Sequence, residues 1–441
     1  MNRIWYKNYP KIIPQEIDLT QCESIVSVFE TSVSQFSEKP AFSNMGVTLT
    51  FNELNEKVDQ FASFLQNELR LKKGDRIAIQ LPNLLQYPIA AFAALKLGLI
   101  IVNTNPLYTP HEMEHQFKDS GAVSIIILAN YAAHLEKIIK NTAIQSVVIT
   151  EIGDLFPLPK KILVNSVVKY VKKMVPAFHI PNAYTFNQAL DIGKENKFIK
   201  ASVNLDDIAF LQYTGGTTGV SKGAVLTHKN IVANMLQIDA WMLPKLKMGQ
   251  EIAIAALPLY HIFSLTVNCL AFLKYGAHNV LITNPRDFSS FIKDLQKYPF
   301  TLLTGVNTLF NALMNHADFQ KIDFSHLKVS VAGAMALQKT VSQKWMELTK
   351  SVIVEGYGLT EASPVVCCNP IDGTDRVGTI GLPLPSTDIE IRNDEGVALG
   401  LGEAGELCVK GPQVMKEYWN RPDETEKVLS KGWLLTGDIA T

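Results

Sequence analysis

The sequence predicts an α/β protein in which alternating strands and helices build parallel sheets, followed by a small β unit. Two observations lead to this fold class. Apolar runs of strand length alternate with segments of helical spacing through most of the 441 residues, and this alternation is typical of βαβ units. After about Gly373 the sequence pattern changes to short strand-like segments separated by turn residues.

The predicted elements follow one another in a regular order. Helical spacing covers residues 51–69 and 88–97. Strand-like apolar runs cover residues 76–81, 124–128, 147–150, 208–213, 251–256 and 329–332, and the later short strands cover 389–392 and 405–410. We therefore expect three units: a first α/β unit with an N-terminal extension at 1–200, a second at 201–373 and a small β unit at 374–441.

Composition narrows the class of protein. Hydrophobic residues make up 47% and charged residues 19%, and the formal charge is −1, so a globular protein without an electrostatic footprint for nucleic acid is expected. The five cysteines show no CxxC spacing and the N-terminus shows no signal segment, which makes a reducing cytoplasm the default location. The most apolar run, 89–102, contains Lys96 and is too short to span a bilayer.

Residues 161–175 form a candidate amphipathic helix. Its apolar face would hold Leu163, Val164, Val167, Val168, Tyr170, Val171, Met174 and Val175, and its basic face Lys161, Lys169, Lys172 and Lys173. We expect the apolar face to pack on the core. The alternative is a helix that lies on the anionic inner face of the cell membrane.

A glycine-rich and threonine-rich loop at residues 213–223 directly follows the predicted strand 208–213. It reads Tyr-Thr-Gly-Gly-Thr-Thr-Gly-Val-Ser-Lys-Gly, so backbone amides, hydroxyls and the Lys222 ammonium would surround a polyphosphate. The loop is not a Walker A motif, because Lys222 lies between Ser221 and Gly223. A P-loop NTPase is therefore discarded.

This loop resembles the signature of the adenylate-forming superfamily of acyl-CoA ligases, luciferases and peptide-synthetase adenylation domains. Further motifs agree in order: Pro-Leu-Tyr-His at 258–261, Gly-Ala-Met at 333–335, Glu-Gly-Tyr-Gly-Leu-Thr-Glu at 355–361 and Gly-Trp-Leu-Leu-Thr-Gly-Asp at 432–438. Residues 103–109 and 305–310 look specifically like bacterial long-chain fatty acid ligases. The resemblance runs along essentially the whole chain and implies ATP, Mg²⁺ and CoA as cofactors and a fatty acid as substrate.

The resemblance assigns a role to each motif. The phosphates of ATP would lie on Thr214, Gly215, Gly216, Thr217, Thr218, Gly219 and Lys222, and adenine beside Gly333, Ala334, Glu355, Gly356, Tyr357 and Gly358. Thr360 would bond the α-phosphate, Glu361 would hold Mg²⁺ and Asp438 would bond the ribose. His261 would seat the carboxylate, so that His261, Lys222 and Thr360 form the catalytic set.

An apolar pocket is expected for the fatty acyl chain, since each buried methylene gains about 0.8 kcal/mol. By similarity, its candidate residues are Leu265, Val306, Leu309, Phe310, Ala334 and Met335. The segment 333–337, Gly-Ala-Met-Ala-Leu, departs from the glycine-richer form of this family motif. Acyl chain length is not determined by these residues, and both peripheral membrane contact and a homodimer are compatible with the resemblance.

In the family, a mobile C-terminal domain carrying a catalytic lysine follows the Thr-Gly-Asp motif, whereas this sequence ends at Thr441. On the sequence we therefore expect a truncated form that binds nucleotide and fatty acid but has little overall activity. Two alternatives stay open. One is a fatty acyl-AMP ligase that passes its product to a carrier protein, and the other is a sensor that binds ATP or fatty acid without turnover.

Overall fold

The computed structural model describes residues 3–215 and 220–441, and over these ranges the strands form three sheets. The eight-stranded sheet has the order β19-β9-β8-β4-β3-β5-β6-β7. Its strands are β3 (Arg76–Gln80), β4 (Ile100–Asn103), β5 (Ser124–Leu128), β6 (Ser146–Thr150), β7 (Tyr184–Thr185), β8 (Ile208–Thr214), β9 (Lys222–Thr227) and β19 (Glu417–Tyr418). All neighbours from β8 to β7 are parallel, and β9 and β19 extend the sheet in antiparallel fashion.

The nine-stranded sheet has the order β16-β15-β14-β13-β12-β10-β11-β1-β2. Its strands are β1 (Pro40–Asn44), β2 (Val47–Thr50), β10 (Ile252–Ala255), β11 (His278–Leu281), β12 (Leu302–Gly305), β13 (Val329–Ala332), β14 (Ile353–Gly358), β15 (Val365–Cys368) and β16 (Leu382–Pro383). The strands from β14 to β1 are parallel. The small sheet is antiparallel and contains β17 (Asp388–Arg392), β18 (Gly405–Lys410), β20 (Leu429–Ser430) and β21 (Trp433–Ala440).

These sheets confirm the predicted fold class, and the predicted strands 124–128, 329–332 and 405–410 match β5, β13 and β18 residue for residue. The sheets, however, exchange strands across the predicted range limit at residue 200. Strands β1 and β2 pair in the nine-stranded sheet, while β8 and β9 complete the eight-stranded one. The exchange follows from hydrogen bonding between strands far apart in sequence, which local patterns do not report.

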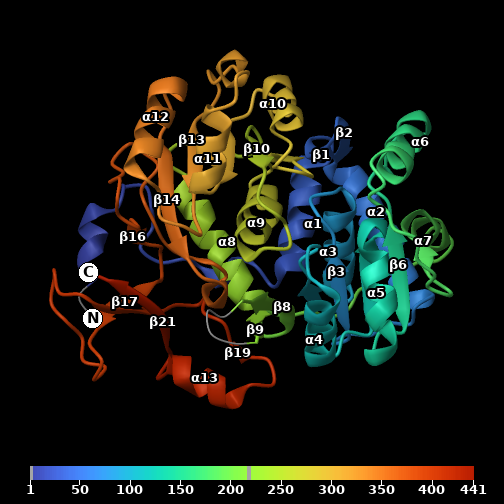
Figure 1. Ribbon diagram of the computed structural model, residues 1–441. Helices are drawn as coiled ribbons and strands as arrows, with labels where there is room; N and C mark the ends of the chain where they lie inside the picture. The colour runs from blue at the N-terminus through green and yellow to red at the C-terminus, as the bar shows by residue number, and fades with distance from the viewer. Residues whose placement is uncertain (1–2, 216–219) are drawn as a thin grey trace.

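Helices cover both large sheets (Figure 1). Their bounds are α1 (Ile25–Phe36), α2 (Phe51–Asn67), α3 (Gln86–Lys96), α4 (Pro110–Ser120), α5 (Ala132–Ile138), α6 (Leu158–Ser166), α7 (Phe186–Gly193), α8 (His228–Met242), α9 (Ile262–Ser264), α10 (Phe288–Lys297), α11 (Asn307–Met314), α12 (Lys339–Thr349) and α13 (Pro422–Val428). The largest apolar core joins α1, α2, α3 and α8 to strands of both large sheets. A second core lies under α10, α11 and α12, and a third under α4 and α5.

Sequence signals explain where several helices begin. The side chains of Thr50, Thr109, Thr185 and Thr227 cap α2, α4, α7 and α8, and each receives the backbone N–H three residues later. The residue at that position returns a side-chain bond, which is the capping-box arrangement. Such caps typically contribute about 1 kcal/mol each.

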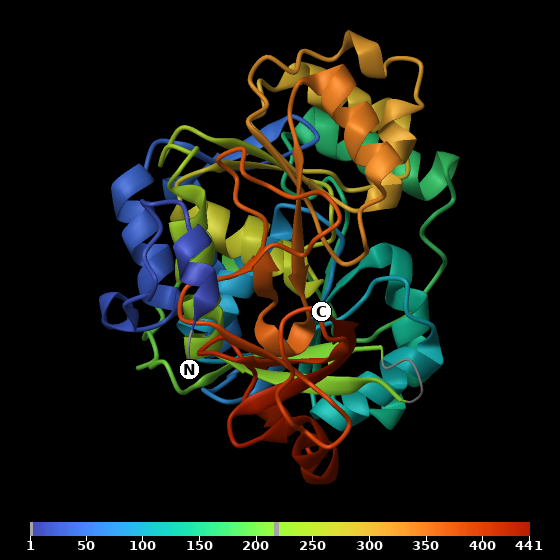
Figure 2. The same ribbon diagram turned by 90° about the vertical axis from the view of Figure 1, so that its left-hand side faces the viewer.

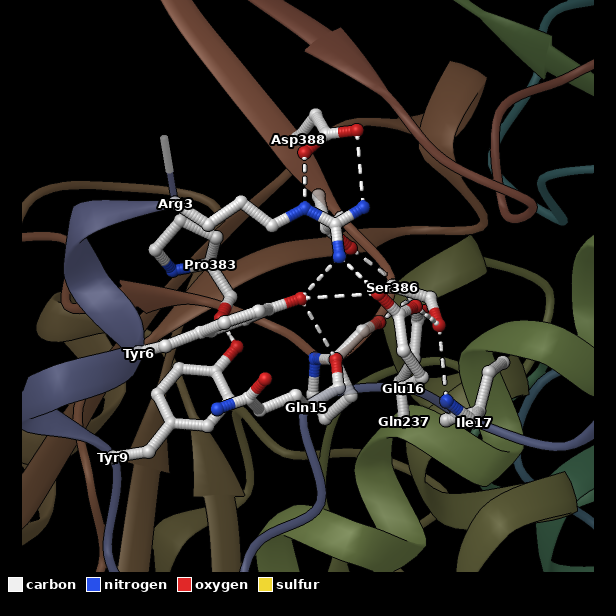
Figure 3. Close-up of polar contacts among 12 residues, drawn as sticks. Arg3, Tyr6, Tyr9, Gln15, Glu16, Ile17, Gln237, Pro383, Ser386 and Asp388 are labelled. Atoms are coloured by element: carbon white, nitrogen blue, oxygen red, sulfur yellow. Dashed lines mark hydrogen bonds and ion pairs between the residues drawn. The ribbon is translucent and has the colours of Figure 1, made fainter. Parts of the chain in front are cut away.

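The N-terminal segment is hydrogen-bonded to the small sheet, which Figure 2 shows in red beside the C-terminus. The Arg3 guanidinium donates to both carboxylate oxygens of Asp388 on β17, at 2.5 and 3.2 Å. Tyr9 donates to the carbonyl of Pro383, and the Ile17 amide donates to Ser386 at 2.9 Å. These bonds surround Arg3, Tyr6 and Glu16 in Figure 3 and fasten the first residues against the segment 383–388.

The expectation that the apolar face of 161–175 packs on the core is wrong. The segment forms the helix α6 and then a π-helical turn, η5 (Val167–Val171). Within the described range 3–215, neither element contains a fully buried residue. Leu163 is 64% exposed and Val171 73% exposed. The helix projects from the edge of the molecule in Figure 1, and its apolar face is only partly covered: Val164, Val167 and Val168 are half-buried, whereas Leu163, Tyr170 and Val171 are exposed.

Candidate active site

A cavity of about 800 Å³ opens at the carboxyl ends of β8, β13 and β14, and residues from the small sheet complete it. Ligands in open α/β sheets bind outside these strand ends. The predicted site residues that line it are Thr214, Gly215, Lys222, His261, Gly333, Ala334, Gly356, Tyr357, Gly358, Thr360, Glu361 and Asp438. The predicted Gly216, Thr217, Thr218 and Gly219 lie outside the described residues.

One end of the cavity is built on the β8–β9 hairpin, which carries the ends of the predicted phosphate-binding loop. Thr214 and Lys222 are register partners at the ends of these antiparallel strands, so the two described ends of the glycine-rich loop lie opposite each other. The Lys222 ammonium contacts Glu424 at 2.8 Å and lies 4.8 Å from the centre of the Tyr418 ring. Glu424 on α13 had no predicted role.

The Tyr418 hydroxyl donates to the Glu361 carboxylate at 2.6 Å. Burial, together with the negative charge of Glu361, raises the pKa of Tyr418 well above its ordinary value. Glu361 is therefore held as an acceptor at the edge of the cavity, beside the cationic Lys222. Among the described residues, no group of three or more His, Cys, Asp or Glu side chains could hold a metal ion by itself.

Another part of the cavity pairs an aromatic ring with a carboxylate. The Tyr357 hydroxyl donates to Asp438 at 2.6 Å, joining β14 of the nine-stranded sheet to β21 of the small sheet. Burial first, and then this bond, raises the pKa of Tyr357. Gly358 sits close to the neighbouring strand, since an added Cβ would lie 2.1 Å from the Pro364 carbonyl oxygen. A side chain at position 358 would thus push the strand carrying Tyr357 out of place.

Glu355 does not line the cavity with its neighbours in the motif. Its buried carboxylate accepts the Leu337 amide at 3.0 Å, and burial raises its pKa. This bond fixes the segment 333–337, in which Ala334 adopts a left-handed conformation with φ 66°. Glu355 therefore positions the turn that supplies Gly333 and Ala334 to the cavity.

His261 lies between the polar and apolar parts of the site. Its Nδ1 accepts the Phe263 amide at 3.3 Å and caps α9, so the ring proton is on Nε2 in the neutral form. Desolvation lowers the pKa of His261. The Gln212 side chain donates to the adjacent Tyr260 carbonyl at 2.7 Å, which connects this loop to β8 of the other large sheet.

The remaining part of the cavity is apolar and runs between α8, the π-helical segment η6 (Leu265–Phe272) and the nine-stranded sheet. Its apolar side chains are Ile238, Trp241, Met242, Leu246, Phe263, Val267, Phe272, Leu302, Val329, Val331, Ile371 and Leu384. The Trp241 indole donates to the Asn369 carbonyl at 3.0 Å, which fixes this ring on the cavity wall.

The predicted acyl-pocket residues do not line this cavity: Leu265, Val306, Leu309, Phe310 and Met335 are all absent from its described lining. Leu309 and Phe310 are buried in the core under α11 and α12, where Phe310 packs edge-on against Trp345 at 4.9 Å. Leu265 is buried within η6, and Met335 is 59% exposed. An apolar residue near a motif does not reveal which helix face meets the cavity. The apolar residues spread over α8 were the overlooked signal.

The family model described as AMP-binding enzyme matches residues 29–419. The long-chain-fatty-acid–CoA ligase of Salmonella typhimurium is 51% identical over 440 residues, with 100% of this chain and 78% of the relative covered. The ligase of the same name from Haemophilus influenzae is 52% identical over 441 residues, with the same coverage. That of Bacillus subtilis is 39% identical, with 99% and 77% covered.

Solved structures agree on the fold. An anthranilate CoA ligase in complex with anthranoyl-AMP has a TM-score of 0.83 at 22% identity, with 97% of this chain and 76% of that chain covered. A long-chain-fatty-acid–CoA ligase from Archaeoglobus fulgidus has a TM-score of 0.80 at 23% identity, with 97% and 82% covered. Fold, site motifs and similarity along the whole of this chain lead to one conclusion: the chain belongs to the AMP-binding enzymes and is a member of their long-chain-fatty-acid–CoA ligase group.

Proposed function

We propose that this chain binds ATP and a long-chain fatty acid in the one cavity and joins them as acyl-AMP with release of pyrophosphate, the acyl group then passing to CoA as a thioester. The observation that carries the proposal is the continuity of the cavity. Lys222, Thr360 and Asp438 line its polar part, and the side chains of α8 and η6 line its apolar part. A carboxylate at the boundary would face the α-phosphate.

The reaction joins two anions, so positioning and charge neutralisation carry most of the catalysis. A fatty acid carboxylate oxygen attacks the α-phosphorus, and the bond to the bridging oxygen of pyrophosphate breaks. Lys222 would neutralise the departing pyrophosphate, and Thr360 would donate to an α-phosphate oxygen. His261, neutral with its proton on Nε2, would donate to the fatty acid carboxylate without competing for the phosphates as a second cation.

Mg²⁺ fits the residues present. Magnesium ions bound to nucleotides usually take one or two carboxylates, with phosphate oxygens and waters as the other ligands. Glu361 supplies one carboxylate at the cavity edge, already aligned by Tyr418. Bound there, Mg²⁺ would neutralise phosphate charge. Tyr357 would stack on adenine, and Asp438 would accept from the ribose in place of the Tyr357 hydroxyl.

The test is exchange of labelled pyrophosphate into ATP, driven by a long-chain fatty acid and compared with acetate. Lys222→Ala should slow exchange roughly 100-fold or more, the effect expected for one lost charged donor. Lys229→Ala is the matched control, because Lys229 is exposed at the start of α8. If Lys222→Ala exchanges as fast as the parent protein, or if acetate serves as well as the long-chain acid, the proposal is wrong.

We further propose that the exposed helix α6–η5 contacts anionic membranes. Leu158, Ile162, Leu163, Tyr170, Val171 and Met174 are all exposed apolar side chains, and Lys169, Lys172 and Lys173 are exposed beside them. Apolar insertion combined with basic residues is typical of helices that lie in a bilayer interface. Within the described residues, the chain has no helix of sufficient length and apolarity to cross a bilayer.

Sedimentation with vesicles tests this contact. We expect binding to vesicles rich in phosphatidylglycerol and weaker binding to pure phosphatidylcholine. Leu163→Glu with Val171→Glu should abolish sedimentation, whereas Leu401→Glu, at an 88% exposed leucine of the small β unit, should not. Equal losses in both proteins would contradict an α6–η5 contact.

A further inference from the structure

One carboxylate at the polyphosphate end of the cavity is bonded to two lysines. Glu424 accepts from the Lys222 ammonium at 2.8 Å through Oε2 and from the Lys427 ammonium at 2.5 Å through Oε1. Lys222 and Lys427 both line the cavity. A carboxylate that is paired with the lysine proposed to bind phosphate competes with that phosphate. The adenylation reaction itself does not require this carboxylate.

The position of Glu424 is fixed by its surroundings. Arg421, which precedes α13, donates to the Asp119 carboxylate at 2.7 Å, and Asp119 also accepts the Tyr213 hydroxyl at 2.7 Å. The backbone amide of Tyr418 donates to Thr425 of α13 at 2.9 Å. The helix is thus anchored to the unit that carries β8, on the side of the cavity where Lys222 emerges.

Lys222 is held from two sides. Glu424 contacts its ammonium, and the ring of Tyr418 lies beneath it, while the Tyr418 hydroxyl is bonded to Glu361. The side chains of Lys222 and Glu424 are 25% and 35% exposed. The Lys222–Glu424 ion pair is therefore partly solvated, and its two side chains can separate. When another anion replaces Glu424 at Lys222, no charge is left buried without a partner.

We propose that Glu424 is an exchangeable counter-ion: it occupies Lys222 in the empty site, is displaced by the polyphosphate of ATP, and is then retained by Lys427. This rests on the proposed function, in which Lys222 binds the β- and γ-phosphates. Lys427 is essential to the exchange, since a displaced carboxylate left unpaired would repel the incoming phosphates. The two lysines lower the pKa of Glu424 to about 2, so the competing anion is present at every working pH.

The first experiment measures the affinity for Mg-ATP by calorimetry. Glu424→Gln removes the competing charge and should tighten Mg-ATP binding about two- to fivefold, the range expected for one partly solvated ion pair. AMP affinity should not change, because AMP lacks the two phosphates that meet Lys222. Raising the salt concentration should reduce the gain, because screening weakens the pair.

Glu426→Gln is the matched control. Glu426 lies on the same helix and is exposed, and among the described residues it has no ion pair within 4.0 Å. It therefore changes the net charge equally without touching Lys222. If Glu426→Gln tightens Mg-ATP binding as much as Glu424→Gln does, the effect comes from net charge alone and the proposal is overturned. Unchanged or weaker Mg-ATP binding in Glu424→Gln would also overturn it.

A double-mutant cycle separates the role of Lys427. Lys427→Gln should weaken Mg-ATP binding severalfold in the parent protein but have no effect in the Glu424→Gln background. A loss that persists in that background would mean that Lys427 binds phosphate directly, and it would overturn the retention step. Lys222→Ala distinguishes the two proposals: if it leaves Mg-ATP affinity unchanged, the proposed phosphate site itself fails. If it weakens binding while Glu424→Gln has no effect, only the counter-ion proposal fails.

Discussion

His261 and His228 show how one residue type serves two purposes at the ends of neighbouring helices. His261 lines the cavity and caps α9 with its Nδ1. His228, the first residue of α8, is fully buried, and its Nδ1 accepts the Ile25 amide at 3.2 Å. Desolvation, partly opposed by the charge of Asp207, lowers the pKa of His228 to about 4. A histidine of this kind stabilises the fold only while it is neutral.

The depressed pKa predicts the direction of a pH effect on stability. Below about pH 6.5 the unfolded chain takes up a proton that the folded protein excludes, so this histidine favours unfolding increasingly as the pH falls toward 4. At pH 5, His228 should lower the free energy of unfolding by about 2 kcal/mol, which is 1.36 kcal/mol for each pH unit below 6.5. Urea unfolding of His228→Gln should therefore show a smaller loss of stability between pH 7 and pH 5 than the parent protein.

His111→Gln is the control for this measurement, because His111 is exposed. We expect its pH dependence to follow that of the parent protein. A parallel loss of stability in His228→Gln and the parent protein would show that the buried imidazole does not carry the effect.

At the scale of elements, short segments far apart in sequence hold the site together. Tyr357 on β14 bonds Asp438 on β21, and Tyr418 of β19 bonds Glu361. The small sheet therefore contributes Asp438 to the cavity only while it stays docked. The N-terminal segment fastens it through the Arg3–Asp388 bond on β17 (Figure 3), and the Arg3 pKa is raised mainly by that bond.

Loss of this bond should loosen the small sheet. Arg3→Met is expected to lower the free energy of unfolding by roughly 1 kcal/mol, since a charged bond at a partly exposed site is worth little more. Hydrogen exchange should rise in β17 and β18 but not in β13. Lys11→Met, an exposed lysine of the same segment, is the control. Unchanged exchange in β17 after Arg3→Met would show that the segment does not fasten the sheet.

At the scale of the whole molecule, the two large sheets form one body because each takes strands from both parts of the chain and both pack on one core. Strand β1, from the first part of the chain, pairs with β11 of the second part, and β2 pairs with β1 at the edge of the same sheet. Apolar residues of α8 belong to the core that joins both large sheets. The cavity lies where these parts meet the small sheet. The residues that line it range from Thr214 to Asp438, more than two hundred positions apart.

The sequence alone determined the order of the elements and the identity of the motifs, because strand and helix periodicity and the Gly-Thr-Lys loop are local patterns. It also led to the long-chain fatty acid ligase group, which the relatives confirm. Twelve predicted site residues, from Thr214 to Asp438, line one cavity, because they lie at strand ends of both large sheets, in the loops that follow these strands, or on β21 of the small sheet.

Only the tertiary structure decided what depends on packing between distant segments. It placed Phe310 in a core and Trp241 on the cavity wall, although both are aromatic residues on apolar helices. It left much of the apolar α6–η5 face exposed, and it brought Glu424 to Lys222 across about two hundred positions. Burial and ion pairing are properties of the assembled surface, so residue type and local spacing could not reveal them.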